Sequence, residues 1–488
     1  MLNYLKNIKY ICYYNILFAN LFYMFLYYKC FNTVTKRQIY LSHYFVQKSG
    51  AIPIKIGQHV KMFAHAIQSN NEMMKYFIDL FNTLYEDVDI HDFNYSSMLF
   101  QNEYDKNILD IFELDAKYKI KSGSVAQVYK AKIKNNIFNT HCKTVAIKIV
   151  HPDFNIQLKF MYPIIFIYNY LYKKNLFKGT IFNIVDLQAL FIDLCNQNDM
   201  TYEYKNIQYF YDIYKNNKFL NIPYPISCSK NILIMEYIDA VDINTVYKNN
   251  ASTEYKLMHV LWIIVLFTRE NYASLDLLHA DLHDYNWKIK SNDYSKVVIF
   301  DYGLVINKRS KYKTDEDFNT FNDRITKIMY GLDNKDLDVF IENIIHFITF
   351  GNNDDIEKIK IEFRNEFIKA STEKDTTSNI VNTLLIFSIN NTFKFEKIII
   401  NIIVIIVSLS RHLETFIYPK TCKSDMILTH YISQYEFCSK NKVFDSAKDQ
   451  LAKYYLTNER FLNTTVKKTR FNNLLTSTNY TNNINYDV

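Results

Sequence analysis

Two short motifs constrain this chain more than anything else in its sequence. Residues 279–286 read HADLHDYN, and Asp301-Tyr302-Gly303 follows 20 residues beyond Asp281, after a β-type run. Phosphoryl transfer needs a carboxylate near the attacking oxygen, and an Asn and an Asp that hold magnesium on the phosphates. Either motif alone is common in loops. Together, in this order and spacing, they predict Asp281 as the catalytic carboxylate and Asn286 and Asp301 as magnesium ligands.

A lysine inside a β-type run predicts where the nucleotide lies. Lys148 is in the middle of Val145-Ala146-Ile147-Lys148-Ile149, and burying a charge there is costly unless it is paired. In a kinase-like fold this lysine contacts the phosphates of ATP and pairs with a glutamate. The alternative is an edge strand whose lysine points to water.

Two flanking segments fit the same hypothesis. Residues 121–129 read as strand, turn and strand, around a small-residue loop that can bring backbone N–H groups close to phosphates. Residues 232–238 read as a buried strand that, in a kinase layout, is the hinge facing adenine; an ordinary core strand is the alternative. The residues expected at the nucleotide are Ser122, Gly123, Ser124, Val125, Ala146, Lys148, Glu236 and Tyr237.

Further motifs select one branch of kinase-like proteins. Lys55-Ile56-Gly57-Gln58 precedes the kinase-like region, Asp199 and Glu203 lie between Lys148 and the hinge, and His283 completes an H-x-D-x-H pattern. With these motifs the chain resembles the UbiB, or aarF-domain-containing (ADCK), family of atypical kinases over roughly residues 45–350. The loop at 121–124 is most similar to the mitochondrial branch, which carries Ser and Gly in place of an Ala-rich loop.

The resemblance implies a role for each matching residue. Lys148 contacts the α- and β-phosphates, and Glu203 pairs with it. Asp281 is the catalytic-loop aspartate, while Asn286 and Asp301 hold the metal. A regulatory extension that folds over the active site and obstructs protein substrates is implied at Lys55, Gln58 and Asp199.

The resemblance also implies an activity and a place in the cell. Family members hydrolyse ATP, so ATP and Mg²⁺ are the expected cofactors, and the chain is expected to be an ATPase or a small-molecule or lipid kinase rather than a protein kinase. Membrane lipids or quinone precursors, and a complex for lipid or coenzyme Q biosynthesis, are the implied partners, at the mitochondrial inner membrane. Gln197 and Asp284 depart from the family pattern. They leave open a catalytically silent nucleotide-binding scaffold or regulator of such a complex.

The N-terminus has an unusual charge pattern. The first acidic residue is Glu72, and residues 10–28 carry no charge at all. At about 1.5 Å per residue, this stretch is just long enough to span a bilayer, but its tyrosines and asparagines also suit a helix lying in the interface. Three alternatives stay open: a membrane-inserted or membrane-lying segment, an organelle-targeting peptide, and a buried helix.

Taken together, the sequence predicts an α+β, bilobal protein-kinase-like fold with a helical N-terminal extension and a largely helical C-terminal lobe. The expected divisions are 1–45 for targeting or membrane association, 46–115 for the extension, 116–240 for the N-lobe with inserted helices, 241–463 for the C-lobe, and 464–488 for a disordered tail. The net charge of +7 is modest and no basic block occurs, so no nucleic-acid partner is expected. Nothing in the sequence fixes an oligomeric state.

Overall fold

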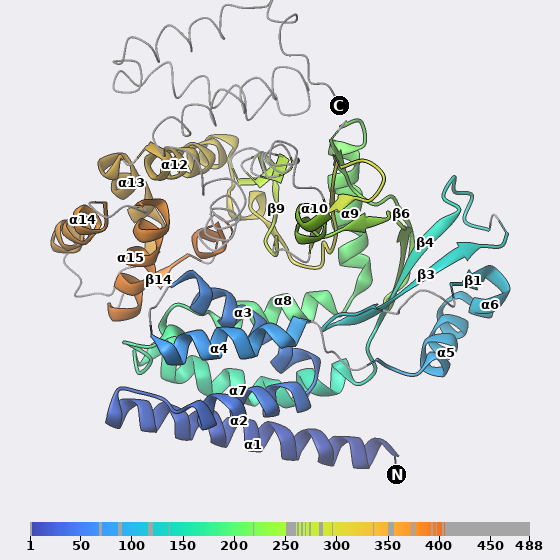
Figure 1. Cartoon of the computed structure of the whole chain (residues 1–488), viewed down its shortest axis with the longest axis horizontal. Coiled ribbons are helices and arrows are strands. Elements are labelled where there is room, and N and C mark those ends of the chain that lie inside the picture. Colours follow the sequence, from blue (N-terminus) through green and yellow to red (C-terminus); the bar gives the residue numbers. More distant parts are fainter. Residues whose placement is uncertain are drawn as a thin grey trace, which may run out of the picture.

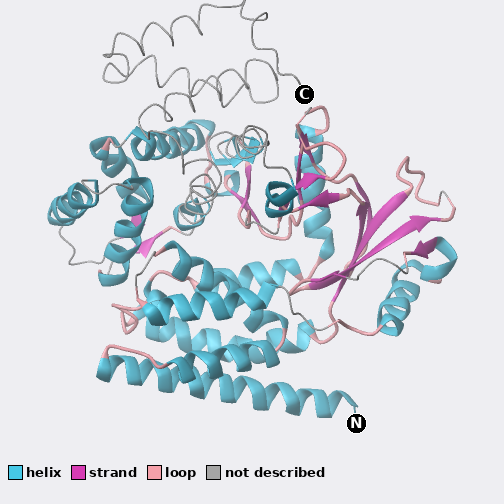
Figure 2. Ribbon diagram, in the orientation of Figure 1, coloured by secondary structure: helices cyan, strands magenta, loops and turns pink. Residues whose placement is uncertain are grey.

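The computed structural model contains one six-stranded sheet, with helices along its sides, and several smaller sheets (Figure 1; Figure 2). The residues that the structure describes are 2–67, 71–85, 90–115, 121–135, 137–217, 219–249, 260, 263–264, 267–268, 270–272, 275–282, 286–294, 296–334, 336–349, 356–371, 376–391, 394–396, 398–402 and 405. His283, Asp284 and the tail predicted at 464–488 lie outside these ranges.

The large sheet forms the N-terminal lobe. Its order is β1-β3-β4-β7-β6, with β2 paired to β3, and all of its pairs are antiparallel. The predicted β-type runs at 124–131, 145–150 and 232–235 correspond to β3, β4 and β7. The strands are β1 (Phe112–Leu114), β2 (Lys121–Ser122), β3 (Ala126–Ile133), β4 (Thr144–Val150), β6 (Pro225–Cys228) and β7 (Ile232–Glu236).

Two helices cover one face of this sheet. α5 (Phe93–Tyr104) and α6 (Ile108–Ile111) lie beside β1. Phe100 is fully buried, stacks on Tyr104 at 4.6 Å between ring centroids, and meets the edge of Phe112 at 5.9 Å. Because β3, β4 and β7 supply Val and Ile to the same cluster, burial of these apolar side chains holds the helices on the sheet.

A second layer consists of helices that come from both the extension and the N-lobe. α3 contacts α2, α4, α7 and α8, and α1 lies against α2 and α7 along the lower edge of Figure 1. The capping box of Thr35 and Gln38 fixes the start of α2. The helices are α1 (Leu2–Phe31), α2 (Lys36–Lys48), α3 (Ala51–Ala66), α4 (Glu72–Asn82), η1 (Thr83–Tyr85), α7 (Phe154–Lys173), η2 (Ile181–Asn183), α8 (Leu187–Gln197) and α9 (Met200–Tyr214).

The sequence pattern predicts one helix over 154–190, and this is wrong. The chain leaves the helix after Lys173, and Asn175 and Gly179 adopt left-handed backbone conformations, with φ of 55° and 81°. A residue in that conformation cannot continue a right-handed helix. The resulting turn carries Asn183, whose Nδ2 donates to the carbonyl oxygens of Ser388, Ile389 and Asn391, so the turn attaches this layer to the C-terminal lobe.

The uncharged stretch 10–28 lies within α1. None of the helices in the described residues is both long enough and apolar enough to cross a membrane, so the expected transmembrane helix is not found. Asn15 and Asn20 and the many tyrosines lower the hydropathy of α1. One face of α1 is buried against its neighbours through Tyr10, Tyr14 and Leu17.

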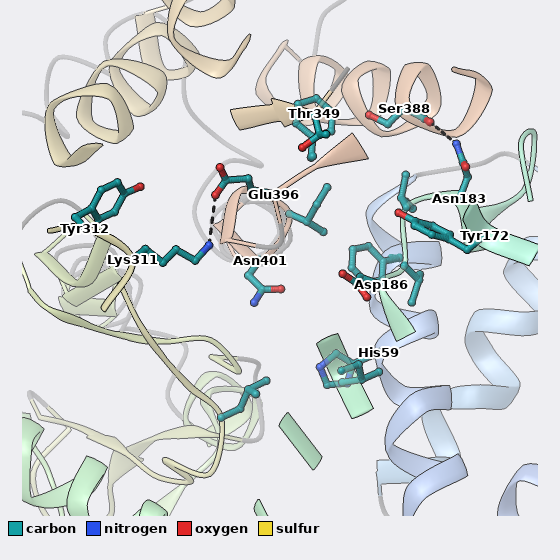
Figure 3. A pocket seen from close by; sticks show the side chains of 17 residues that line it. His59, Tyr172, Asn183, Asp186, Lys311, Tyr312, Thr349, Ser388, Glu396 and Asn401 are labelled. Carbon is teal, nitrogen blue, oxygen red and sulfur yellow. Dashed lines mark hydrogen bonds and ion pairs between the residues drawn. The ribbon is translucent and has the colours of Figure 1, made fainter. Parts of the chain in front are cut away.

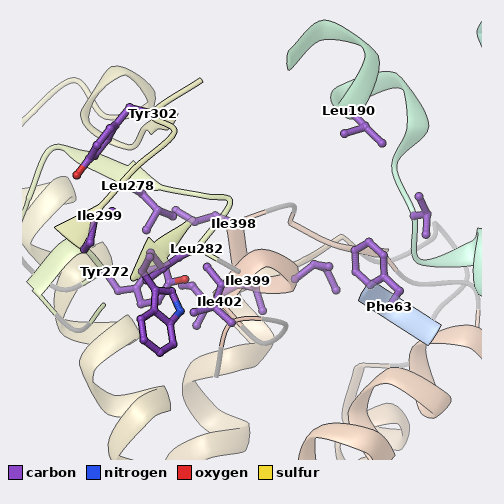
Figure 4. Packing of buried hydrophobic residues seen from close by; sticks show 14 of the residues in the cluster. Phe63, Leu190, Tyr272, Leu278, Leu282, Ile299, Tyr302, Ile398, Ile399 and Ile402 are labelled. Carbon is purple, nitrogen blue, oxygen red and sulfur yellow. The ribbon is translucent and has the colours of Figure 1, made fainter. Parts of the chain in front are cut away.

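The C-terminal lobe begins with small sheets, of which only the β-type run before Asp301 was predicted, and continues with the predicted helices. β5-β11-β10-β8 forms a mixed four-stranded sheet, and β9 pairs with β12. Figure 4 shows Leu278, Leu282, Ile299 and Tyr302 packed near Ile398, Ile399 and Ile402. The elements are β5 (Leu220–Asn221), β8 (Ala240–Val241), α10 (Ile243–Asn249), β9 (Leu277–His279), β10 (Trp287–Lys290), β11 (Val297–Ile299), β12 (Val305–Asn307), η3 (Arg309–Lys311), α12 (Asp315–Asn334), α13 (Leu337–Ile344), η4 (Ile345–Phe347), β13 (Ile348–Thr349), α14 (Ile356–Ser371), α15 (Thr376–Asn390) and β14 (Lys394–Phe395).

Packing of α5 on the sheet can be tested by shortening one side chain. Phe100→Ala is expected to lower the free energy of unfolding by about 3–5 kcal/mol, because it leaves a cavity among rigid aromatic neighbours. Met98 lies on the same helix and is 67% exposed, so Met98→Ala is expected to change it by less than about 0.5 kcal/mol. Urea unfolding followed by circular dichroism measures both. Equal losses would contradict this packing.

Candidate active site

Three charged side chains that are far apart in the sequence meet inside the molecule. Lys148 Nζ lies 2.8 and 2.9 Å from the two carboxylate oxygens of Glu203, and 3.2 Å from Oδ1 of Asp301. Lys148 and Glu203 are buried, whereas the side chain of Asp301 keeps 43% of its surface exposed. β4 is flanked by β3 and β7. The edge-strand alternative for Lys148 is therefore wrong, and its charge is paired, as burial requires.

Local structure explains how the two carboxylates are positioned. Asp199 caps the start of α9, and Glu203 follows in the first turn of that helix. Asp301 adopts a left-handed conformation with φ of 56°, which aspartate tolerates better than most residues. The N–H of Gly303 donates to Asp301 Oδ1 at 3.2 Å. The turn therefore holds one oxygen of Asp301 toward the protein and leaves the other available to a ligand.

The charges of this cluster reinforce one another. Burial alone would lower the pKa of Lys148, but the carboxylates of Asp301 and Glu203 outweigh it and raise that pKa above its ordinary value. Burial likewise opposes the ionisation of Asp301, yet Lys148 and Lys55 hold the pKa of Asp301 below its usual range. Lys148 and Asp301 are therefore charged at neutral pH.

The predicted catalytic carboxylate has a partner from the extension. Lys55 Nζ lies 2.6 Å from Oδ2 of Asp281, and the two side chains are only 8% and 3% exposed. Asn286 Nδ2 donates to the backbone oxygen of Asp281 at 2.7 Å, closing the loop between β9 and β10. The structure thus brings α3 directly onto the loop predicted to carry catalysis. The neighbouring His283 and Asp284 lie outside the described residues.

Asn286 and Asp301 offer oxygen atoms of the kind that magnesium prefers. Asn286 donates through its amide nitrogen and Asp301 binds Lys148 through Oδ1, so Asn286 Oδ1 and Asp301 Oδ2 are the remaining polar atoms of the two side chains. Hard oxygen ligands, few in number and completed by phosphates and water, suit Mg²⁺. Within the described residues no group of three His, Cys, Asp or Glu side chains is arranged as a metal site. The residues present therefore fit magnesium that arrives with a nucleotide.

Two histidines that were not predicted from the sequence contact the small-residue loop at 121–124 or each other. His151 Nε2 lies 2.9 Å from the carbonyl oxygen of Gly123 and 3.2 Å from Oγ of Ser122. His91 meets the other ring nitrogen of His151 at 2.9 Å. Burial, together with the neighbouring His151, lowers the pKa of His91 to about 4. The sequence did offer one clue, since His151 directly follows β4. The pairing of β4 with β3 continues to His151, whose N–H donates to the carbonyl oxygen of Val125, beside the loop.

The remaining nucleotide residues lie around this loop. Ser124 and Val125 follow Gly123, where the chain turns into β3, and both are buried. Ala146 is buried in β4 opposite Met235 of β7.

At the predicted hinge, the N–H of Glu236 donates to Tyr224 and the N–H of Tyr237 to Thr144. These two donors already serve the sheet, so adenine recognition there would use carbonyl oxygens. The hinge role stays a prediction.

The extension residues serve different functions from one another. Gln58 Nε2 donates to the carbonyl oxygen of Leu84 at 2.9 Å, tying α3 to η1. A Cβ on Gly57 would lie 2.9 Å from Leu84 Cδ1, so this glycine permits the close approach. Asp199 caps α9. Gln197, at the site of a family carboxylate, is buried beside Gly303.

The Lys55–Asp281 pair can be tested by a double-mutant cycle. Lys55→Met or Asp281→Asn alone is expected to cost about 3–5 kcal/mol of stability, because each leaves a buried partner uncompensated. The double variant is expected to cost less than the sum, with a coupling energy of about 1–3 kcal/mol. Urea unfolding of the four proteins measures it.

A matched control is an exposed pair at the same distance. Lys36 and Glu72 also lie 2.6 Å apart, but their side chains are 52% and 76% exposed. The cycle of Lys36→Met with Glu72→Gln is expected to give less than about 1 kcal/mol. A coupling at Lys55–Asp281 as small as at this surface pair would contradict the buried arrangement.

Two known proteins resemble part of the chain. The chain is 26% identical over 303 residues to an uncharacterised protein from the hydrogenase 1 5′ region of Clostridium pasteurianum, covering 61% of this chain and 54% of that one. It is 27% identical over 219 residues to the probable protein kinase UbiB of Actinobacillus pleuropneumoniae, covering 42% and 38%. The chain thus spans about half, or less, of the length of these relatives.

One solved structure aligns with the chain at a distance. It is the complex of Rv3197 with erythromycin from Mycobacterium tuberculosis, with a TM-score of 0.40 and 15% identity over 67% of this chain and 83% of that one. A likeness this distant carries no argument. The family comparison is firmer, because the model of the ABC1 atypical kinase-like domain matches residues 83–326, half of the sequence. The chain belongs to the ABC1 atypical kinase-like family.

Proposed function

We propose that the chain uses ATP and magnesium, either as an ATPase or as a kinase of a small molecule or lipid. The observation that carries the proposal is the buried contact of Lys148 with both Glu203 and Asp301. Glu203 and Asp301 fix the ammonium group of Lys148 in one place, where it can contact the phosphates of a nucleotide that arrives with a cation. One of those carboxylates, Asp301, is partly exposed, as a metal ligand has to be.

In the proposed reaction each side chain has a distinct task. Lys148, oriented by Glu203, neutralises charge on the phosphates, and Asp281 orients the attacking oxygen. Asn286 and Asp301 would hold magnesium, which offsets the negative charge of the phosphate oxygens when it is bound. Little covalent chemistry is required of the protein, so positioning and electrostatics supply most of the acceleration.

The position of Lys55 bears on the acceptor. Its ammonium group is paired with Oδ2 of Asp281, which places α3 beside the carboxylate that a protein substrate would have to reach. Water or a small hydroxyl compound can replace one ammonium group, whereas a folded protein would have to displace the helix. This supports ATP hydrolysis or a small acceptor over protein phosphorylation.

The same contact supports a second candidate, a catalytically silent nucleotide-binding scaffold or regulator. If Lys55 never leaves Asp281, no attacking oxygen is oriented and the chain binds ATP without turnover. Titration calorimetry and an ATPase assay on the chain and on Lys55→Met distinguish the two. ATP binding without hydrolysis in both proteins would favour the scaffold.

Removing the predicted metal ligand tests the first candidate. Asp301→Asn is expected to lower magnesium-dependent ATP hydrolysis at least about 100-fold, because the neutral amide no longer attracts the cation. Asp212→Asn is the control for the same chemical change, since Asp212 lies on α9 with a 53% exposed side chain, and it should hydrolyse ATP like the parent. Undiminished hydrolysis by Asp301→Asn would refute the proposed site.

We further propose that the chain works at a membrane, at the mitochondrial inner membrane by the family resemblance, in support of lipid or coenzyme Q homeostasis. The outward face of α1 supports the membrane contact. On that face, 41–58% of the surface of the following side chains is exposed: Ile8, Ile11, Phe22, Tyr23 and Leu26. The opposite face is also apolar and is buried against neighbouring helices. A helix that is apolar on all sides is usually covered on all sides, so the exposed face of α1 suits a further apolar contact.

α7 extends this face with the same chemistry. Tyr162, Phe166 and Tyr170 recur at every fourth residue and are 60–70% exposed. The contacts of Phe25 with Phe177, and of the Tyr28 hydroxyl with the carbonyl oxygen of Gly179, join the end of α1 to the turn after α7. Neither residues 1–71 nor residues 154–185 contain an acidic side chain. Aromatic side chains among lysines suit the interface of an anionic bilayer.

Vesicle sedimentation tests this contact. The chain is expected to bind phosphatidylcholine vesicles containing phosphatidylglycerol more tightly than pure phosphatidylcholine, and salt should weaken the difference. Phe22→Ser with Leu26→Ser is expected to weaken binding at least about tenfold, by removing apolar surface from the interface. The control, Ile361→Ser with Ile368→Ser, changes two exposed side chains of α14. Equal binding by the two variants would rule out α1 as the contact.

A further inference from the structure

A cavity of about 610 Å³ lies between the N-terminal extension and the C-terminal lobe (Figure 3). α3 contributes His59 and Phe63 to one side, and the C-terminal lobe contributes Phe395, Glu396, Ile400 and Asn401 to another. Its volume falls within the range of small-molecule sites, roughly 300–1,000 Å³. None of the residues assigned above to phosphoryl transfer lines it, so it is a separate site.

Much of the cavity wall is apolar. Phe63, Leu190, Leu304 and Ile400 line it and are otherwise buried in the core. These residues come from α3, from α8, from the turn after Gly303 and from the C-terminal lobe. An apolar body placed here would contact all of these parts of the fold at once, and burying it would be favourable by about 25 cal/mol per Å².

One hydrogen-bond donor in the cavity wall, the amide of Asn401, has no acceptor within the described residues. Nδ2 of Asn401 is buried and has no partner in the described part of the chain, which costs about 1–3 kcal/mol. Figure 3 shows the side chain of Asn401 among the lining residues, below Lys311 and Glu396. Those two side chains are paired at 3.4 Å. An acceptor oxygen on a bound molecule would satisfy the amide.

The charges around the cavity exclude an anion. Lys311 is balanced by Glu396, and Asp186 adds a negative charge on the side where Tyr172 lies. Burial and the charge of Asp186 raise the pKa of Tyr172, so its hydroxyl stays neutral. With His59 counted as neutral, the lining carries one excess negative charge, and an uncharged ligand suits it better than a carboxylate or phosphate.

We propose that this cavity binds an uncharged amphipathic molecule whose carbonyl or hydroxyl oxygen accepts from Asn401 Nδ2, and whose apolar body packs on Phe63, Leu304 and Ile400. The occupant contacts the extension and the C-terminal lobe together. The proposal does not depend on ATP turnover, because binding is measured without nucleotide.

Prodan, an uncharged naphthalene with one ketone oxygen, is the probe. With the full chain we expect saturable binding and a shift of its emission to shorter wavelength. Asn401→Leu removes the donor without removing apolar volume, so it is expected to fold and to weaken prodan binding at least tenfold. Asn343→Leu is the control, since Asn343 lies outside the cavity and its amide already donates to Val339.

A second probe and a second variant separate the polar contact from the apolar one. N-phenyl-1-naphthylamine has no ketone oxygen, so it is expected to bind the parent and Asn401→Leu equally. Ile400→Trp fills the cavity, and in a folded protein, checked by circular dichroism, it is expected to abolish binding of both probes. The proposal is overturned if the parent shows no saturable prodan binding, or if Asn401→Leu binds prodan as the parent does.

Discussion

The burial of one ammonium group organises this molecule. Lys148 lies in the middle of a sheet, where an unpaired charge would cost several kcal/mol, so the fold has to bring carboxylates to it. Glu203 arrives on a helix that packs against β6 and β7, and Asp301 arrives on a turn of the other lobe. Asn206 Nδ2 donates to the carbonyl oxygen of Tyr302 at 2.9 Å, which ties that turn to α9. The pairing of Lys148 is therefore also the junction of the two lobes.

A second buried pair attaches the extension to this junction. Lys55 reaches Asp281 only because α3 lies close to η1, an approach that Gly57 permits and Gln58 secures. His59, one turn further along α3, donates through Nδ1 to the carbonyl oxygen of Lys55 at 3.1 Å and also lines the cavity. One helix thus connects the catalytic loop with the space between extension and lobe, so a shift of α3 changes both.

The predictions that succeeded were those whose cause is local. The strand around Lys148 follows from its periodicity, and Asn286 lies beside Asp281 because one short loop carries both. The catalytic role of Asp281 and the metal-binding roles of Asn286 and Asp301 stay predictions. The partner of Lys55 was not predictable, because Asp281 lies 226 residues away in the sequence. The end of α7 at Lys173 was also not predicted. The apolar pattern continues beyond it, and the helix ends because the backbones of Asn175 and Gly179 are left-handed.

Magnesium and Lys55 of the extension both offset negative charge at the proposed active site. Glu203, Asp281 and Asp301 carry three negative charges, against two positive charges on Lys148 and Lys55. The cluster is already negative, so under the proposed function the phosphates of ATP are repelled unless a cation accompanies them. If Lys55 leaves Asp281, the excess negative charge grows and the attraction for a divalent cation grows with it. The metal replaces the positive charge that Lys55 takes away when it leaves Asp281. Release of α3 and entry of the metal therefore favour each other.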